Sequence, residues 1–376
     1  MAQVSTQSLP LTVPELPAAP QRLVSLDAFR GTIMALMVLV NTPGGHEVYA
    51  PLEHADWNGW TPTDVVFPSF LWIVGAAMTL SLGRRLAAGI SRARLFAHIV
   101  RRSAIIYALG LVVYMYPGFN LHTQRLLGVL QRIAICYLIA GAIYLTTRVR
   151  GQIVWIVSLL AAYWIMMKLI PVPGYGAGRL DVDGNFAHYI DRLVLGSHNY
   201  RWTVTWDPEG IVSTLPAIAT TLFGIMAGHI LRLPRLLAER TTWLFLTGNL
   251  LMAAGLIANI WMPINKKLWS DSFSLFMAGL DFVMFAMMLW CVDGLGFKRF
   301  TKPLVIMGMN AITVYMASEL LDEAFGATGL HEWLYVRVFL AMASPINASL
   351  LYAIAYVLLM YGIAYVMYRR GWFLRV

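Results

Sequence analysis

Long apolar stretches separated by short polar links dominate the chain. A stretch of about 20 apolar residues is long enough to cross the ~30 Å hydrocarbon core of a bilayer as a helix. About ten such stretches are present, at residues 28–45, 63–83, 103–117, 126–147, 152–170, 211–231, 242–262, 273–292, 303–321 and 348–368. The pattern predicts an all-α fold, a polytopic transmembrane bundle of about ten helices.

Charge also separates this chain from soluble proteins. Of the 376 residues, 59% are hydrophobic and only 12% are charged, too few charges to cover a soluble globule of this size. The net charge of +9 would suggest nucleic acid, but most lysines and arginines fall in alternate links, such as 84–102 and 232–240. That alternation is typical of a polytopic membrane protein. We therefore expect a lipid bilayer, and no nucleic acid, as a partner.

The same asymmetry predicts the topology. Because basic residues concentrate on the cytoplasmic side, both termini are expected in the cytoplasm and the link that contains His54 on the opposite side. Residues 1–21 are rich in proline and hold no basic residue, so they do not read as a signal peptide. They are predicted to form a disordered cytoplasmic tail, and residues 22–376 one transmembrane domain.

One link, residues 171–208 on the His54 side, is much longer than the others. Links of this length are usually functional or disordered. Trp202 and Trp206 favour an ordered lid on the membrane face, although an interfacial aromatic belt would have the same composition. A helix is expected within the link near residues 189–196.

The polar link between the first two predicted spans holds the clearest candidate for catalysis. Asn41 ends one helix, His54 follows in the link, and Asp64 opens the next helix. A carboxylate near a helix N-terminus that binds imidazole would fix its tautomer and raise its basicity. Such a histidine could act as a base or accept an acyl group itself. The simpler alternative, that Asn41 and Asp64 only cap their helices, stays open on spacing alone.

Several polar groups fall inside apolar spans, where they are expected to face the bundle interior or a wet cavity. They are Gln131, Arg132, Asn249, Asn259, Asp281, Asn310 and Glu319. Arg132 and Asp281 either line a pocket or form a structural ion pair. Two links on the His54 side, 206–216 and 263–269, add carboxylate and ammonium groups to the same membrane face.

Motifs for two common chemistries are missing from the sequence. It contains no glycine-rich phosphate loop, Walker string or His-Glu-x-x-His motif, so ATP hydrolysis and zinc chemistry are not expected. Cys136 and Cys291 both lie in predicted spans. They are too few to indicate a disulfide framework or a metal site.

A set of short strings runs in order along most of the chain. The strings are Ser25-Leu-Asp-Ala-Phe-Arg-Gly31, Val40-Asn-Thr-Pro-Gly-Gly45, His54-Ala-Asp-Trp-Asn-Gly59, Asp64-Val-Val-Phe-Pro68, Leu130-Gln-Arg-Ile133, Tyr189-Ile-Asp-Arg192, Asp207-Pro-Glu-Gly210, Pro263-Ile-Asn-Lys266 and Gly308-Met-Asn310. In these strings the chain resembles the heparan-alpha-glucosaminide N-acetyltransferase family, from about Arg22 to about Glu319.

The resemblance implies that cytoplasmic acetyl-CoA, as co-substrate, donates its acetyl group to an amino sugar on the far side of the membrane. The active-site histidine of the family falls on His54, and its nearby functional asparagine falls on Asn41. Unlike the lysosomal member, the protein is expected to lack a lumenal N-terminal domain and its attached helix. A small or cell-wall amino sugar and a bacterial inner membrane are therefore expected, and a homodimer stays open.

We accordingly assign roles to the candidate residues. His54 removes a proton from the acceptor amine or accepts the acetyl group, Asn41 donates a hydrogen bond to the oxyanion, and Asp64 orients His54. The residues assigned to the coenzyme cleft, which needs guanidinium and amide donors for a phosphate-rich ligand, are Arg30, Gln131, Arg132 and Asn310. The residues assigned to the sugar, some of which would instead hold the bundle closed, are Trp57, Asn58, Asp207, Glu209, Asn265 and Lys266.

Two other classes of function remain as alternatives. An O-acyltransferase acting on surface polysaccharide would share the membrane architecture, and a comparison of glucosamine with its N-acetylated form as acceptor would distinguish it. A transporter of an amino-sugar metabolite would also explain the buried charges. Its discriminating sign, an inverted repeat with interrupted helices in matching positions, is not found in the sequence.

Overall fold

The computed structural model describes residues 23–118, 120–299 and 301–374. The tail predicted at residues 1–21 lies outside them. The main helices are α1 (Val24–Asn41), α2 (Val66–Ala87), α3 (Arg92–Met115), α4 (Val129–Thr146), α5 (Val149–Leu169), α6 (Phe186–Val194), α7 (Thr214–Leu231), α8 (Leu237–Ala258), α9 (Asp271–Leu289), α10 (Thr301–Met309), α11 (Ala311–Thr328), α12 (Leu330–Leu334) and α13 (Pro345–Arg369). Short helical turns flank them at Ala50–Leu52, Pro62–Val65, Gly196–His198, Trp290–Gly294 and Tyr335–Phe339.

The predicted all-α membrane bundle is confirmed. Within the described residues, nine helices are long and apolar enough to cross a membrane, or ten if α10 and α11 count as one span. The prediction of a single helix at 303–321 is wrong in one respect, because α10 and α11 meet at a 79° bend. Asn310 lies at that bend, between the two helices.

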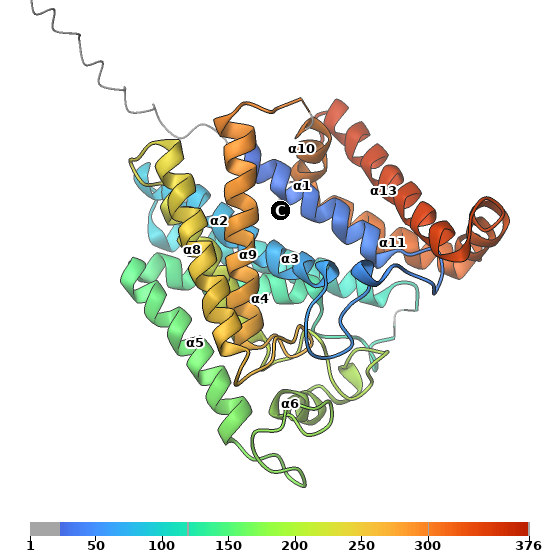
Figure 1. Cartoon of the computed structure of the whole chain (residues 1–376), viewed down its shortest axis with the longest axis horizontal. Helices are drawn as coiled ribbons and strands as arrows, with labels where there is room; N and C mark the ends of the chain where they lie inside the picture. Colours follow the sequence, from blue (N-terminus) through green and yellow to red (C-terminus); the bar gives the residue numbers. More distant parts are fainter. Residues whose placement is uncertain (1–22, 119, 300, 375–376) are drawn as a thin grey trace, which may run out of the picture.

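Burial separates central helices from peripheral ones. In α2 and α7, 72% and 78% of the most apolar window is buried inside the protein, compared with 28% in α5 and 17% in α8. The outer faces of α5 and α8 therefore have the exposure expected of lipid-facing helices. In Figure 1, α5 and α8 lie along one side of the bundle, and α8 packs beside α9.

Glycines let the central helices approach closely, as is common between membrane helices. A Cβ atom on Gly75 of α2 would lie 2.0 Å from the Thr221 carbonyl oxygen of α7. A Cβ atom on Gly31 of α1 would lie 1.7 Å from the Leu304 carbonyl oxygen of α10. Larger residues at either position would push these helix pairs apart.

An aromatic cluster fills the centre of the bundle. The buried Trp72 ring of α2 packs against Phe29 of α1 and against Phe282 and Phe285 of α9, with ring centroids 6.1, 5.3 and 5.4 Å away. On α9, the buried Asp281 accepts a hydrogen bond from the Ser69 hydroxyl at 2.5 Å. The Arg132–Asp281 ion pair, left open by the sequence, is not formed: Asp281 bonds Ser69, whereas Arg132 bonds Ser213 and Gly210.

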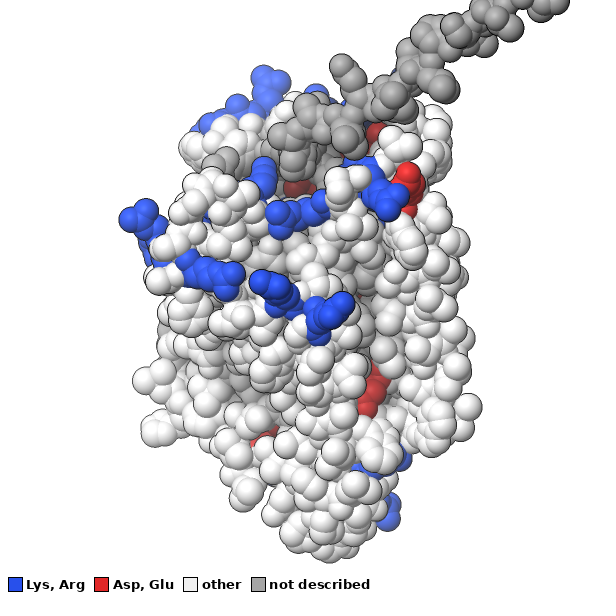
Figure 2. Space-filling model, turned by 90° about the vertical axis from the view of Figure 1, so that its left-hand side faces the viewer, with Lys and Arg blue, Asp and Glu red and all other residues white. Residues whose placement is uncertain are grey.

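The helical bundle has two ends, which differ in the links and helix termini that they contain. One end, which we name the His54 end, contains the links at 42–65, 170–213 and 259–270. The other, the cleft end, contains the first turns of α1 and the last turns of α2 and α7. Figure 2 shows the side of the molecule that lies at the left of Figure 1. Most of the lysines and arginines on this side gather toward the upper end of the view.

The long link folds over the His54 end. It contains α6, and the sequence predicts a helix there at 189–196. The helix begins earlier, at Phe186, because the Asn185 side chain caps it by accepting the His188 N–H at 2.8 Å. The buried Asp191 carboxylate accepts the backbone N–H groups of Ile211 and Asp207 at 3.0 and 3.3 Å. These bonds attach α6, which lies beyond the lower end of α5 in Figure 1, to the segment that leads into α7.

Candidate active site

The His54 imidazole and the Asp64 carboxylate form a hydrogen-bonded pair. Nδ1 of His54 lies 2.7 Å from Oδ1 of Asp64, whose side chain is only 1% exposed, whereas that of His54 is 48% exposed. Because a carboxylate only accepts hydrogen bonds, Nδ1 carries a proton. In the neutral ring, Nε2 then has the free lone pair of a general base.

Asp64 performs both of the roles that the sequence left open. Its Oδ2 atom accepts the backbone N–H groups of Ala55 at 3.1 Å and Thr61 at 3.0 Å. With Thr61 it forms a capping box at the turn Pro62–Val65. Helix capping and orientation of His54 therefore use the same side chain, and the cap fixes the position of the oxygen that binds the imidazole.

Lys266 lies over the imidazole of His54. Its Nζ atom is 3.0 Å from Nδ1 and 3.2 Å from Nε2, and 3.5 Å from Oδ1 of Asp64. A nitrogen almost equidistant from both ring nitrogens lies above the ring and not along an in-plane lone pair. Burial lowers the pKa of Lys266, opposed by the carboxylates of Asp64 and Glu209. The ammonium group of Lys266 therefore lies beside both nitrogens of the imidazole.

Two links hold this arrangement in place. The Gly59 N–H donates to the Ile264 carbonyl at 2.7 Å, and the φ angle of Gly59 is +98°, which favours glycine. The Asn265 amide, 1% exposed, donates to the Asn58 side chain at 3.3 Å and accepts the Leu268 N–H at 2.9 Å. Of the two predicted sugar-binding amides, only Asn58 is exposed.

Trp57 connects the His54 link to the long link. Its indole N–H donates to the Leu180 carbonyl at 3.0 Å. The indole packs edge-on against His188 and Trp206, whose rings stack with centroids 4.1 Å apart. Burial lowers the pKa of His188 to about 3, so that ring stays neutral in the stack. The contacts of Trp57 are those of a packing residue beneath the site.

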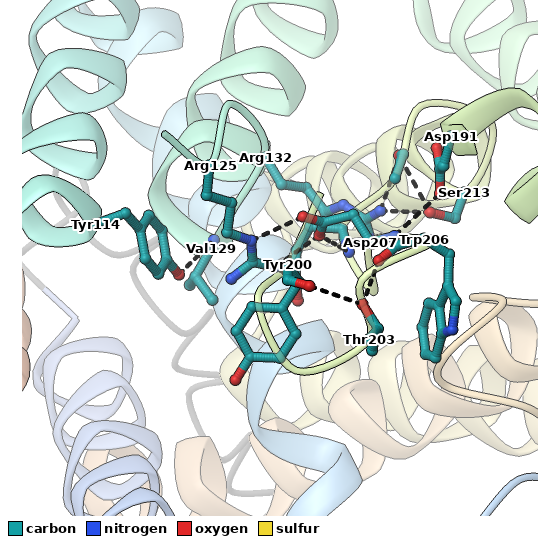
Figure 3. A network of polar contacts seen from close by, with 12 residues as sticks. Tyr114, Arg125, Val129, Arg132, Asp191, Tyr200, Thr203, Trp206, Asp207 and Ser213 are labelled. Atoms are coloured by element: carbon teal, nitrogen blue, oxygen red, sulfur yellow. Dashed lines mark hydrogen bonds and ion pairs between the residues drawn. The ribbon is translucent and has the colours of Figure 1, made fainter. Parts of the chain in front are cut away.

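A buried arginine missed by the sequence reasoning pairs with two predicted residues (Figure 3). Arg125 binds Asp207 in a bidentate manner, at 2.8 and 2.6 Å, and forms an ion pair with Glu209. Its guanidinium lies between the rings of Tyr114 and Tyr200, 4.8 and 4.3 Å from their centroids. Asp207 and Glu209 therefore have a partner that holds the bundle closed.

The charges of this cluster influence one another. Burial raises the pKa of Asp207, and Arg125 opposes that shift. Burial also raises the pKa of Glu209, but the positive charges of Arg125, Arg132 and Lys266 outweigh it and the net shift is downward. A signal for Arg125 was present in the sequence: it is an arginine in a short link on the side of the membrane that carries few basic residues.

Arg30, assigned to the coenzyme, lies at the opposite end of α1. It lines a cleft of about 1130 Å³ between the ends of α1, α2, α7 and α8. The basic residues along the cleft are Arg30, Arg84, Arg232, Arg235, Arg240 and Lys298. Asp27 and Asp293 also line it, so the positive charge is partly balanced.

The other residues assigned to the coenzyme lie in the interior. Arg132 donates to the Ser213 hydroxyl at 2.5 Å and to the Gly210 carbonyl at 3.1 Å. Its Nε and Nη1 atoms, and both amide atoms of Gln131 and of Asn310, are buried without a hydrogen-bond partner in the part of the chain that is described. Buried polar atoms are normally paired, so these groups have the bonding capacity of a ligand-binding surface.

Asn41 is exposed at the last position of α1. Its side chain lies close to the Glu319 carboxyl group of α11. No hydrogen bond joins Asn41 to His54 among the described residues. The structure thus gathers His54, Asp64 and Lys266 into one group and places Asn41 at the same end of the bundle with a different partner.

Groups of three or more His, Cys, Asp or Glu side chains placed to hold a metal ion are not present in the described ranges. Cys136 and Cys291 are both free thiols, and only Cys291 is exposed.

Comparison with known proteins shows the family to which the chain belongs. A family model described as the catalytic region of heparan-alpha-glucosaminide N-acetyltransferase matches residues 22–245, which include His54, Asp64 and Arg125. The chain belongs to this family. Its members are transmembrane acyltransferases, and the resemblance seen in the sequence is confirmed.

Two curated relatives extend the match beyond residue 245. The heparan-alpha-glucosaminide N-acetyltransferase of Homo sapiens is 31% identical over 366 residues, covering 82% of this chain and 54% of the relative. The protein of the same name from Mus musculus is 29% identical over 362 residues, covering 82% of this chain and 55% of the relative. The chain thus spans about half the length of these relatives.

Proposed function

We propose that the protein transfers the acetyl group of acetyl-CoA to the amine of an amino sugar at the His54 end. The observation that carries this proposal is the His54–Asp64 pair, in which a buried carboxylate accepts the Nδ1 proton and leaves Nε2 as the basic nitrogen of the neutral ring, with the Lys266 ammonium 3.2 Å from it. The names of the curated relatives supply the reaction class and the type of acceptor.

In the proposed step, Nε2 of His54 takes a proton from the acceptor amine as the amine nitrogen attacks the thioester carbonyl. The C–N bond forms, the C–S bond breaks, and the thiolate leaves with the proton returned by the imidazolium. Asp64 stabilises that imidazolium without accepting its proton. Asn41 donates a hydrogen bond to the oxyanion. In enzymes, removal of one such donor typically lowers kcat by about 10²–10³.

The cleft end is the proposed site for the nucleotide part of the donor. Arg30 and the neighbouring guanidinium groups suit phosphates. At a rise of about 1.5 Å per residue, α1 covers about 16 Å between Arg30 and Asn41. The pantetheine arm has the backbone length of roughly five extended residues, about 17 Å. The unpartnered atoms of Gln131, Arg132 and Asn310 would bind its amides.

The acceptor would enter at the opposite end. His54, Asn58 and Lys266 line its proposed position, and Trp57, Asn265 and the Arg125 cluster hold the links around it. We place the cleft end and both termini in the cytoplasm, on the charge asymmetry of the links. A small amino sugar in the space outside a bacterial inner membrane is the proposed acceptor.

The test is release of free thiol by the purified protein in detergent with acetyl-CoA and glucosamine. We expect thiol release to require the acceptor and to be abolished by His54→Ala. The control His122→Ala changes an exposed histidine of another link at the same end and should leave release intact. Equal release with N-acetylglucosamine would favour O-acyl transfer. Absence of acetyl-CoA binding would refute the acyltransferase activity and favour transport.

A further inference from the structure

The turn Pro43-Gly44-Gly45, which directly follows the end of α1, is held by residues far along the chain. The N–H groups of Gly44 and Gly45 donate to the backbone carbonyl and the hydroxyl of Ser349 at 3.3 and 3.2 Å. Nε2 of His331 lies 3.1 Å from the Gly44 carbonyl oxygen. Both polar atoms of the Gly44 backbone are therefore bonded to the segment α12–α13.

The turn packs closely against this segment. A Cβ atom on Gly44 would lie 2.7 Å from atoms of Tyr335 and Tyr352. A Cβ atom on Gly45 would lie 2.4 Å from the Tyr335 hydroxyl. The missing side chains of the two glycines thus allow this close contact, and the contact restrains the chain immediately after Asn41.

The orientation of the His331 ring is defined from both sides. Because a carbonyl oxygen only accepts, Nε2 carries the proton and donates it to Gly44. Nδ1 then accepts from the Tyr352 hydroxyl at 3.2 Å, with an Asp322 carboxylate oxygen 3.7 Å away. The His331 and Tyr352 rings also pack with centroids 4.6 Å apart. His331 is therefore a fixed donor and not a mobile surface residue.

Helix α11 connects this clamp to the side chain of Asn41. Glu319 lies close to the Asn41 side chain, and Asp322, which lies beside His331, follows three residues later on the same face of the helix. The side chain of Asn41 thus lies beside Glu319, and the backbone that follows it is held by His331 and Ser349.

We propose that His331 is a positioning residue for acyl transfer, which holds the Gly44 carbonyl and thereby aims the Asn41 amide at the reacting carbonyl. This role rests on the proposed function, since it acts through Asn41. An amide displaced by about 1 Å loses much of its effect on the reaction. His331 itself does not touch the substrates.

The test compares His331→Ala with His331→Gln, whose amide nitrogen can replace Nε2 as donor to Gly44. We expect Ala to lower kcat by about 10–10², up to the lower end of the range for a lost oxyanion donor, with a KM for acetyl-CoA changed less than about twofold. Gln should recover most of the rate. Glu332→Ala, an exposed neighbour on α12, is the matched control and should resemble wild type.

A double-mutant cycle separates positioning from general stability. If His331 acts through Asn41, His331→Ala should cost nothing further in an Asn41→Ala background. Multiplicative losses, or equal losses for His331→Ala and His331→Gln, would overturn the proposal.

Hydrogen exchange at the Gly44 and Gly45 amides gives a readout that does not need activity. Exchange should be faster in His331→Ala than in His331→Gln or wild type. Unchanged exchange, with Asn41→Ala inactive, would refute the clamp alone and leave the proposed function intact. Full activity of Asn41→Ala would instead refute the proposed part of Asn41 in the reaction, and the positioning role with it.

Discussion

Replacement of Asp64 by asparagine tests the acid–base arrangement most directly. Asp64 accepts hydrogen bonds from the His54 ring and from the N–H groups of Ala55 and Thr61. Asparagine has nearly the same shape and keeps one oxygen acceptor. Alanine would leave both backbone N–H groups without their partner, at a cost of about 1–3 kcal/mol each if they stay buried. Asparagine therefore perturbs the imidazole with the smallest effect on the fold.

The expected consequence is an exchange of tautomers. The amide oxygen of the introduced asparagine would remain with Ala55 and Thr61, because these donors are fixed by the capping box. Its amide N–H₂ would then face Nδ1 of His54 and donate to it, which leaves the ring proton on Nε2. A base with its lone pair turned away from the acceptor cannot remove a proton. The corresponding exchange in Ser-His-Asp enzymes lowers kcat by about 10⁴, which corresponds to about 5.4 kcal/mol.

The assay is thiol release at saturating acetyl-CoA and glucosamine for wild type and Asp64→Asn, with thermal unfolding measured on the same preparations. We expect kcat to fall by about 10³–10⁴ while the unfolding temperature changes little. Retention of kcat within tenfold of wild type would refute the base role of His54 oriented by Asp64. A large fall in unfolding temperature would instead show that the cap dominates the effect.

Three further outcomes follow from the buried charges. Arg125→Ala leaves two buried carboxylates unpaired and should lower the free energy of unfolding by about 3–5 kcal/mol, measured by thermal or denaturant unfolding in detergent. The control Arg201→Ala, which breaks an exposed ion pair, should lower it by under about 1 kcal/mol. Burial raises the pKa of Asp191 from 3.8 to about 6, so its neutral form is favoured in the fold and stability should decrease as pH rises from about 4 to 6; Asp191→Asn should flatten that decrease. Arg30→Ala should raise the KM for acetyl-CoA about 10-fold or more, as for loss of a charged hydrogen bond, whereas replacement of the exposed Arg179 by alanine should leave it unchanged. An unchanged KM for Arg30→Ala would contradict placement of the nucleotide in the cleft.

The membrane spans could be predicted because a bilayer admits few backbone solutions. An apolar stretch in lipid must satisfy its own hydrogen bonds, so length and hydropathy nearly determine a helix. The bend between α10 and α11 was not predictable in this way, because apolar composition continues across Asn310. Composition indicates where a helix crosses the membrane, but it does not indicate where the helix turns.

The same limit applies to the site. His54 and Asp64 are 10 residues apart. Their pairing could therefore be predicted from the sequence alone, because a helix-capping carboxylate and an imidazole lie in the same short link. Arg125 is 82 residues from Asp207, and His331 is 287 residues from Gly44. These contacts depend on which helices pack together, and neither periodicity nor local spacing carries that information. Long-range contacts therefore supplied the residues that the sequence reasoning missed.

The distribution of these contacts bears on what the family match covers. The matched residues 22–245 contain His54, Asp64 and Arg125, yet Lys266 comes from the link before α9, and the partners of Asn41 and its turn come from α11 to α13. A chain ending near residue 245 would keep the His54–Asp64 pair and lose the groups that hold Asn41. The C-terminal helices thus have two roles: they cover the apolar faces of the bundle, and they complete the site around a histidine that lies more than 200 residues earlier in the chain.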